Sequence, residues 1–288
     1  MAVDWADKIA QQLLSRDSVK AGVCLILGAS DTGKTTLAAS LAKHAASSRP
    51  VAIVDADVGQ SHIGPPATVG WALVDNRKDF LQLPVSGINF VGDVSPTGHL
   101  LQLTTAILQC VQKASEAASL IIIDTPGFIH GPAAAALWWT VQRILKPASI
   151  LAVQRSNELK NILAGLEYLE TKLELISSPE EISPKSPLAR QKYRRGKFTE
   201  YFRESCVYNI GLKNVAVQSG RNLSRDVPVH QLLSLRDGKG MDVALGIVVD
   251  WRYSNEIVVV KAPKLDITRV CCLVVGDVSI DVSMISRT

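Results

Sequence analysis

The sequence predicts an α/β protein in which a doubly wound parallel sheet is followed by a small β-rich C-terminal domain. Two observations carry this prediction. Between residues 23 and 169, short apolar runs alternate with segments of helical pattern, and apolar strands joined by helical crossovers are typical of parallel sheets. After about residue 209 the helical segments stop, and short apolar runs are separated by Gly, Pro, Asn and Asp, as in small antiparallel sheets.

Each expected element follows from its local pattern. Apolar residues at helical spacing predict an amphipathic helix over 3–17. The expected strands of the parallel sheet are 23–27, 51–54, 120–123 and 150–153, and the expected helices are 34–46, 100–117, 133–145 and 158–169. The expected strands of the C-terminal part are 215–217, 244–250, 257–260, 270–275 and 279–283. The Pro- and Ser-rich residues 177–189 predict a linker or a mobile loop.

Chain length and composition indicate which class of protein this is. A chain of 288 residues with 47% apolar and 20% charged residues can form one large domain and a small one. No stretch approaches about 18 uninterrupted apolar residues, and the N-terminus lacks a basic region followed by an apolar one. We therefore expect neither a membrane-spanning helix nor a secretory signal. Five cysteines without a C-x-x-C pair and five scattered histidines argue against structural zinc and indicate a reduced, cytoplasmic protein.

The most informative stretch is residues 28–35, which read G-x-x-x-x-G-K-T between an expected strand and an expected helix. This context predicts a phosphate-binding loop, the P-loop of NTPases, because backbone N–H groups and the helix N-terminus point at the same anion. Lys34 is expected to bridge the β- and γ-phosphates of a nucleoside triphosphate, and the Thr35 hydroxyl to bind Mg²⁺. The predicted nucleotide-binding residues are Gly28, Ala29, Ser30, Asp31, Thr32, Gly33, Lys34, Thr35 and Thr36.

Two carboxylates follow the second expected strand, in the sequence Asp55-Ala-Asp57-Val-Gly-Gln60. Carboxylates at a strand end beside a phosphate loop hold Mg²⁺ or its waters, and one of them can accept a proton from a nucleophile. Asp57 is favoured for the catalytic role and Asp55 for the metal shell, although either can serve in both. The alternative is that one of the two is a turn residue at the strand end.

Two further segments lie at predicted strand ends or helix starts. Asp124-Thr-Pro-Gly127 either contacts Mg²⁺ through water or is a Pro-Gly turn. Ser95, Thr97 and His99 precede the expected helix 100–117, where they can contact a phosphate or a nucleophile, or act as turn and cap. The fourth expected strand ends in residues 154–158, which lack the [NT]-K-x-D pattern of a guanine site.

A basic cluster follows the Pro- and Ser-rich segment on a chain whose net charge is only +4. It contains six basic residues against the single Glu200, namely Arg190, Lys192, Arg194, Arg195, Lys197 and Arg203. Such a cluster indicates an anionic ligand at one place. On a helix, Arg190 and Arg194 reach the same side, so the segment can close over a nucleotide as an Arg-rich lid and stabilise a transferring phosphoryl group. The alternative is a solvated basic helix face. For Trp138-Trp139, core packing is favoured over base stacking.

In this order, the elements resemble the polynucleotide 5′-hydroxyl-kinase family. That family includes the RNA kinase subunit of the eukaryotic mRNA 3′-end processing complex, the pre-rRNA processing kinase, and shorter archaeal and bacterial relatives. The matching motifs are the loop 28–35 with Asp31, Asp57-x-Gly-Gln60, Gly92-x-x-Ser-Pro-x-Gly-His99, Asp124-Thr-x-Gly127 and the arginine segment ending in Tyr201-Phe202. The resemblance spans about residues 22–205, and the β-rich tail is similar to the short C-terminal domain of the prokaryotic members.

The resemblance implies a domain layout and a reaction. It implies an N-terminal helix in 1–21, a P-loop kinase domain in 22–176, a lid in 177–208 and a β-rich domain in 209–288. The reaction is in-line attack of a 5′-hydroxyl on the γ-phosphate of ATP or GTP, with Mg²⁺ as cofactor. The acceptor is the 5′-hydroxyl end of single-stranded or duplex-end RNA or DNA. Because only the helix 3–17 precedes the loop, no obligatory protein partner is evident.

The resemblance also implies site roles. Asp57 or Asp55 orients or deprotonates the acceptor hydroxyl, Thr35 with an Asp holds Mg²⁺, and Arg190 and Arg194 form the lid. The acceptor end is expected near Gln60, Ser95, Thr97, His99, Asp124 and Arg195. The competing hypotheses are a nucleotide-hydrolysing switch or metallochaperone NTPase, and a non-catalytic nucleotide-binding subunit. The preferences for RNA or DNA, and for ATP or GTP, stay open at this stage.

Overall fold

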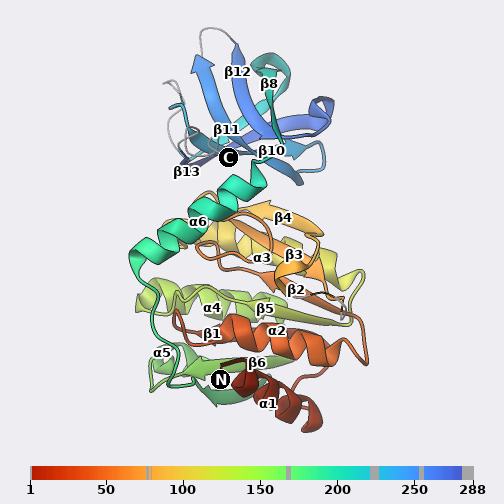
Figure 1. Ribbon diagram of the computed structural model, residues 1–288, viewed down its shortest axis with the longest axis vertical. Helices are drawn as coiled ribbons and strands as arrows, with labels where there is room; N and C mark the ends of the chain where they lie inside the picture. The colour runs from red at the N-terminus through yellow and green to blue at the C-terminus, as the bar shows by residue number, and fades with distance from the viewer. Residues whose placement is uncertain are drawn as a thin grey trace.

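Two β-sheets are stacked along the long axis of the molecule, and a single helix, α6 (Pro187–Tyr201), runs alongside both of them (Figure 1). The computed structural model describes residues 2–75, 78, 80–166, 170–220, 227–252 and 256–280. Among these residues, no helix has the length and apolar character needed to cross a membrane.

The N-terminal sheet has seven strands in the order β4-β3-β2-β5-β1-β6-β7. Their bounds are β1 Gly22–Gly28, β2 Val51–Asp55, β3 Thr68–Leu73, β4 Gly87–Phe90, β5 Leu120–Asp124, β6 Ser149–Gln154 and β7 Lys172–Ser177. Only β3 runs against its neighbours, and the other pairs are parallel. The predicted fold class is confirmed, and the four strands expected from apolar runs are present. Sequence patterns missed β3, β4 and the edge strand β7.

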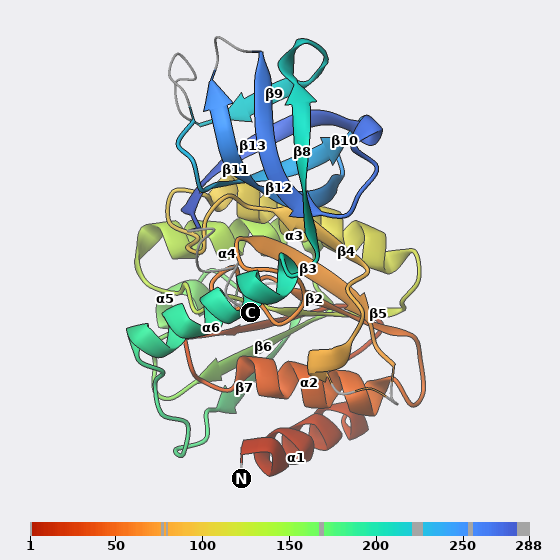
Figure 2. The ribbon, with the colours of Figure 1, turned by 45° about the horizontal axis from the view of Figure 1, so that its top comes forward.

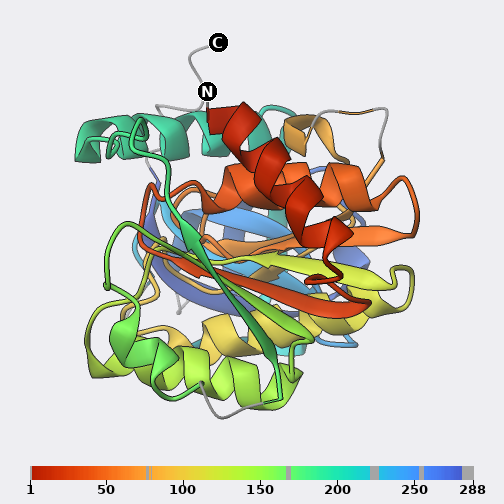
Figure 3. The ribbon, with the colours of Figure 1, turned by 90° about the horizontal axis from the view of Figure 1, so that it is seen from below.

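Helices cover both faces of this sheet (Figure 3). The helices α1 (Ala2–Ser15) and α2 (Lys34–Ala45) cover one face, and α3 (Leu100–Ser115), α4 (Gly131–Leu145) and the short α5 (Lys160–Leu163) cover the other. Separate apolar clusters fill the two layers. This doubly wound arrangement brings the carboxyl ends of β1, β2 and β5 to one edge of the sheet, where open α/β sheets bind ligands.

The expected helix 158–169 is wrong in length, because α5 has only one turn. The Ile162 carbonyl accepts hydrogen bonds from the Trp139 indole and from the Gly165 N–H, so it does not receive the bond that an α-helix would continue with. A side chain at Gly165 would collide with the same indole. Residues 167–169 of the expected helix lie outside the described residues. Trp138 is fully buried, as core packing requires.

The C-terminal sheet has six strands in the order β8-β12-β11-β10-β13-β9. Their bounds are β8 Ser205–Gly211, β9 Ala216–Ser219, β10 Gln231–Asp237, β11 Asp242–Arg252, β12 Ile257–Pro263 and β13 Val270–Ser279, with 3₁₀ turns at Phe80–Gln82 (η1), Leu212–Asn214 (η2) and Ile267–Arg269 (η4). All pairs are antiparallel except β9 with β13. Four expected strands are present, whereas β8 and β10 were missed. Of the expected strand 279–283, Ser279 ends β13 and residues 281–283 lie outside the described residues.

The helix α6 leads from the side of the N-terminal sheet to the first strand of the C-terminal sheet (Figure 2). One apolar cluster joins the two sheets at the end of this helix. It contains Ala67 and Phe90 from the N-terminal sheet side, Phe198 and Phe202 from the end of α6, and Leu232, Leu245 and Ile247 from the C-terminal sheet. The sheet beginning with β8 starts at Ser205, so the expected boundary between residues 208 and 209 falls inside a strand. A division of the chain into independent domains stays a prediction.

Candidate nucleotide and acceptor site

The P-loop connects β1 to α2 at the carboxyl edge of the sheet. A side chain at Gly28 would meet the Val153 carbonyl, and Gly33 has a φ of 95°, a conformation that glycine adopts without strain. Lys34 is buried, and its Nζ donates to the Ala29 carbonyl at 2.7 Å. Burial lowers the pKa of Lys34, while Asp124 and Asp57 oppose that shift. The loop therefore holds a lysine ammonium close to two carboxylates.

Asp124, at the end of β5, accepts a hydrogen bond from the Thr35 hydroxyl at 2.5 Å. Its other oxygen, Oδ1, is buried and has no partner among the described residues. Burial raises the pKa of Asp124 to about 7, and the charge of Asp55 adds to that shift. An unpartnered carboxylate oxygen beside a threonine hydroxyl offers the oxygen ligands that Mg²⁺ takes. Thr35 and Asp124 therefore fit such a cation, and the expected place of Asp124 near the acceptor end stays a prediction.

The two aspartates after β2 have different surroundings. Asp55 is fully buried, and its carboxylate accepts hydrogen bonds from the backbone N–H groups of Asp57, His62 and Ile63. Burial raises the pKa of Asp55 to about 7 against the effect of these donors. Asp55 therefore fixes the β2–β3 loop. Two cavities adjoin the P-loop, and Asp55 lines neither of them. Both oxygens of Asp55 accept N–H groups, and its expected role in the metal shell or as the base stays a prediction.

Asp57, in contrast, lines both of the cavities beside the P-loop. Its Oδ1 accepts from the N–H groups of Gly59 and Gln60, each at 3.0 Å, which fixes the plane of the carboxylate. No described residue donates to Oδ2. Of the two candidates, Asp57 is thus the one whose carboxylate is held in place and faces open space.

Two pockets meet at the P-loop. The first, a cavity of about 190 Å³, is lined by the loop residues 30–36 with Asp57, Gln60, His62, Ile182 and Lys185. The second, of about 240 Å³, is lined by Ser30, Asp57, Gly59, Gln60, Val94, Ser95, Pro96, Pro126, Gly127, Phe128, Arg190 and Arg194. Ser30, Asp57 and Gln60 line both. We call them the donor pocket and the acceptor pocket.

Of the six predicted acceptor residues, Gln60 and Ser95 line the acceptor pocket, and the other four do not. Asp124 lies beside Thr35 instead. Thr97 is exposed and donates its N–H to the Ser95 hydroxyl. His99 contacts the C-terminal sheet, where its Nε2 lies 3.1 Å from the Asp277 carboxylate. Arg195 lines a separate groove. His99 and Arg195 thus face the C-terminal sheet rather than the acceptor pocket.

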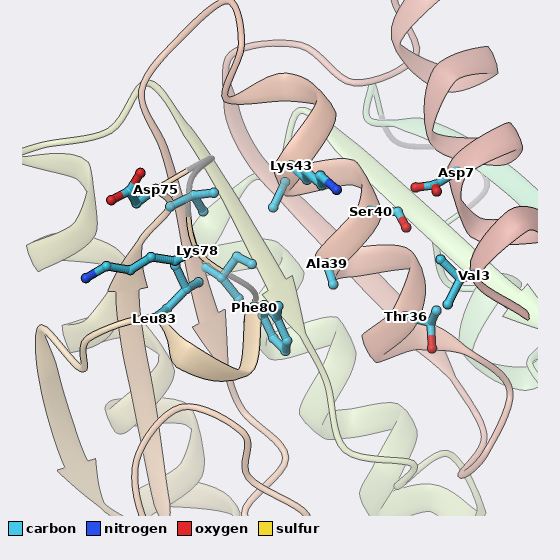
Figure 4. Close-up of a pocket in the computed structure, with 13 residues that line it drawn as sticks. Val3, Asp7, Thr36, Ala39, Ser40, Lys43, Asp75, Lys78, Phe80 and Leu83 are labelled. Carbon is cyan, nitrogen blue, oxygen red and sulfur yellow. The ribbon is translucent and has the colours of Figure 1, made fainter.

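A third cavity, of about 250 Å³, lies beside α2, where α1 and the segment around Phe80 also line it (Figure 4). It is lined by residues of α1, α2 and the β3–η1 segment, including Val3, Lys43 and Phe80. It shares only Thr36 with the donor pocket and contains none of the site carboxylates.

The helix α6 is anchored over the P-loop by polar contacts. Arg190 forms an ion pair with the nearly buried Asp31 at 2.6 Å. Tyr193 donates to the Ser61 carbonyl at 2.9 Å, and Lys197 donates to that of His62 at 3.3 Å. Arg190 keeps a second, buried nitrogen, Nε, without a partner among the described residues. The helix expected to form the lid therefore contacts the P-loop and the β2–β3 loop, and Arg190 also lines the acceptor pocket.

Sequence reasoning missed two cationic residues at the donor pocket. Lys185 donates its N–H to Asp31 at 3.0 Å and its Nζ to Gln60 at 3.1 Å. Arg155, after β6, donates to the carbonyls of Asp31 and Ile182. Lys185 was hidden in a segment that composition marks as a linker, whereas the position of Arg155 at a strand end was a signal that could have been used.

Comparison with known proteins agrees with this geometry. Residues 28–204 match the family described as the P-loop of the mRNA cleavage and polyadenylation factor CLP1. The chain belongs to this family. The chain is also similar to a polyribonucleotide 5′-hydroxyl-kinase of Pyrococcus horikoshii, 32% identical over 74% of this chain and 58% of its own length. Another, from Methanocaldococcus jannaschii, is 35% identical over 70% of this chain and 56% of its own length.

The chain thus spans somewhat more than half the length of these curated relatives. In fold, it is similar to the Clp1p chain solved as a Clp1p–Pcf11p complex, with a TM-score of 0.72 and 13% identity over 96% of this chain and 79% of that one. At this identity, the similarity concerns the fold of the CLP1-family chain and not its chemistry.

Proposed function

We propose that this CLP1-family protein is a polynucleotide 5′-hydroxyl-kinase, which transfers the γ-phosphoryl group of ATP or GTP to the 5′-hydroxyl end of RNA or DNA. The observation that carries the proposal is the shared wall of the two pockets, made by Ser30, Asp57 and Gln60. A nucleotide bound at the P-loop places its terminal phosphate toward this wall, and the acceptor pocket opens on the other side. A hydrolase needs room only for water, whereas this site has a second pocket.

Three groups of residues have separate roles in this reaction. Lys34 and the P-loop N–H groups bind the phosphates. Asp57, held by the N–H groups of Gly59 and Gln60, uses its other oxygen to accept the proton of the attacking hydroxyl. Arg190 and Arg194, both at the acceptor pocket, stabilise the negative charge of the phosphoryl group in transfer.

Thr35 and Asp124 are the residues that would hold Mg²⁺, with Asp57 next to them. When bound, the cation neutralises charge on the β- and γ-phosphate oxygens. Asp55 has a supporting role, since its bonds to the loop 57–63 keep Asp57 in position.

The names of the curated relatives favour RNA as the acceptor. Five curated proteins match the chain, and all of them are called polyribonucleotide 5′-hydroxyl-kinases. The absence of the [NT]-K-x-D sequence favours a donor site that does not select guanine. The unpaired, exposed Cys206 and Cys271 suit the reducing cytoplasm. Activity with no protein partner is part of the proposal.

The test uses the purified chain, γ-labelled ATP, Mg²⁺ and a short 5′-hydroxyl oligoribonucleotide. We expect label on the oligonucleotide, no transfer by Lys34→Ala, and normal transfer by Lys113→Ala, a control on the exposed part of α3. Phosphate release without labelled oligonucleotide would favour an NTPase switch. Nucleotide binding with neither product would favour a non-catalytic subunit.

A further inference from the structure

A groove of about 650 Å³ separates α6 from the end of β13, beyond the acceptor pocket. One wall is the helix, with Lys192, Arg194 and Arg195, and the other is residues 278–280. Arg194 and Val94 line both the groove and the acceptor pocket. The groove therefore adjoins the pocket in which we place the acceptor hydroxyl.

The helix α6 uses a different face for each neighbour. Arg190, Tyr193 and Lys197 bond the P-loop and the β2–β3 loop. The groove face carries Lys192 and Arg195, which are exposed and form no ion pair with a described residue. Anchoring the lid does not use these two cations.

Charge and surface chemistry point to one kind of occupant. Three cations line the groove and no described carboxylate does. Between them lies apolar surface from Phe198, Val278 and Ile280, and Leu188 at the rim is 73% exposed. Cations for phosphates beside apolar surface for bases are the combination that binds single-stranded nucleic acid without reading its sequence.

We propose that this groove binds the nucleotides that follow the 5′ end of a single-stranded acceptor, so that the C-terminal sheet forms one wall of the acceptor channel. The inference rests on the proposed kinase function and extends it from the reacting end to the strand behind it. Lys192 and Arg195 bind phosphates, and the apolar floor packs against bases. Its volume suits one or two nucleotides rather than a long strand.

The test compares a 5′-hydroxyl nucleoside 3′-monophosphate, which has no nucleotide behind its reacting end, with an octanucleotide as acceptor. For the wild type, we expect a lower KM for the octanucleotide. The double variant Lys192→Ala/Arg195→Ala should raise the octanucleotide KM by roughly tenfold and flatten its log–log salt dependence by about 1.4, at roughly 0.7 per phosphate contact. The KM of the nucleoside 3′-monophosphate and both kcat values should not change. Ser279→Glu on β13 should give the same length-dependent defect from the opposite wall.

The control is Lys213→Ala/Lys239→Ala, which removes the same charge from turns of the C-terminal sheet that do not line the groove. Equal KM values for the two acceptors in the wild type, or equal defects on both in the double variant, would overturn the groove while leaving the kinase in place. Fluorescence anisotropy with a 3′-labelled octanucleotide gives a readout independent of turnover. The wild-type chain could bind the octanucleotide but transfer no phosphate to it. If the double variant and Ser279→Glu then weaken that binding, the result would support the groove and reject the kinase function. Binding unaffected by either would overturn the groove.

Discussion

At the scale of single residues, Asp55 and Asp57 are two positions apart and have opposite surroundings. Asp57→Asn removes the oxygen that accepts the proton but keeps the fold, so we expect turnover to fall by at least about a hundredfold with an unchanged melting temperature. Asp55→Asn places an NH₂ group among buried N–H donors, so we expect a loss of about 1–3 kcal/mol of unfolding free energy. Thermal unfolding and initial rates measured on both variants test this. A stable, inactive Asp55→Asn would reverse the assignment.

Asp124 makes stability depend on pH. Its folded pKa and that of Asp55 are raised to about 7, whereas an unfolded aspartate titrates near about 4. Between these values the folded state binds more protons, so the free energy of unfolding should decrease as pH rises from about 4 to about 7. Asp124→Asn removes one titrating group and should flatten this decrease by up to about 1.4 kcal/mol per pH unit. Melting curves from about pH 5 to 8 without Mg²⁺ test it, and identical slopes in both proteins would contradict it.

At the scale of elements, the ion pair between Arg190 and Asp31 joins the lid helix to the P-loop. Asp31→Asn removes the charge of this anchor without touching the guanidinium. We expect faster protease cleavage in 178–186 and little change in kcat, while Arg190→Ala should lose both anchoring and turnover, the latter by roughly a thousandfold. Limited proteolysis and kinetics on the two variants, with Lys113→Ala on α3 as a control, separate the effects. Equal loss of turnover in both variants would assign Arg190 to anchoring alone.

How far elements could be predicted from sequence depended on where their determinants lie. Apolar strands flanked by helices and the G-x-x-x-x-G-K-T loop are local signals, and the structure agrees with them. The strands β3, β7 and β8 have no such signal, because each is defined by the strand beside it. The same distinction between local signals and distant contacts applies to the residues of the site. Asp57 and the P-loop follow from spacing, whereas Thr35 with Asp124, and Lys185 with Gln60, meet only through contacts between distant segments.

At the scale of the whole molecule, the two sheets share an apolar cluster and polar contacts. Asp242 of the C-terminal sheet accepts the Phe90 N–H at 2.6 Å and also bonds Ser234 and Arg236. Phe202 is 1% exposed between the sheets. The position of the lid arginines therefore depends on the C-terminal sheet, because α6 carries these arginines and ends in the shared apolar cluster.

This shared core predicts that residues 1–204 do not fold as a stable unit, although the family match ends there. Removing the C-terminal sheet would expose Phe90, Phe198 and Phe202 together. In the full chain, Phe202→Ala and Leu245→Ala should each cost about 2–5 kcal/mol, and because both sit in one cluster their effects should not add. Circular dichroism and size-exclusion chromatography of 1–204, with a double-mutant cycle on the full chain, test this. A monomeric 1–204 that melts cooperatively would show that the sheets fold independently, and α6 would then be positioned by its P-loop contacts alone.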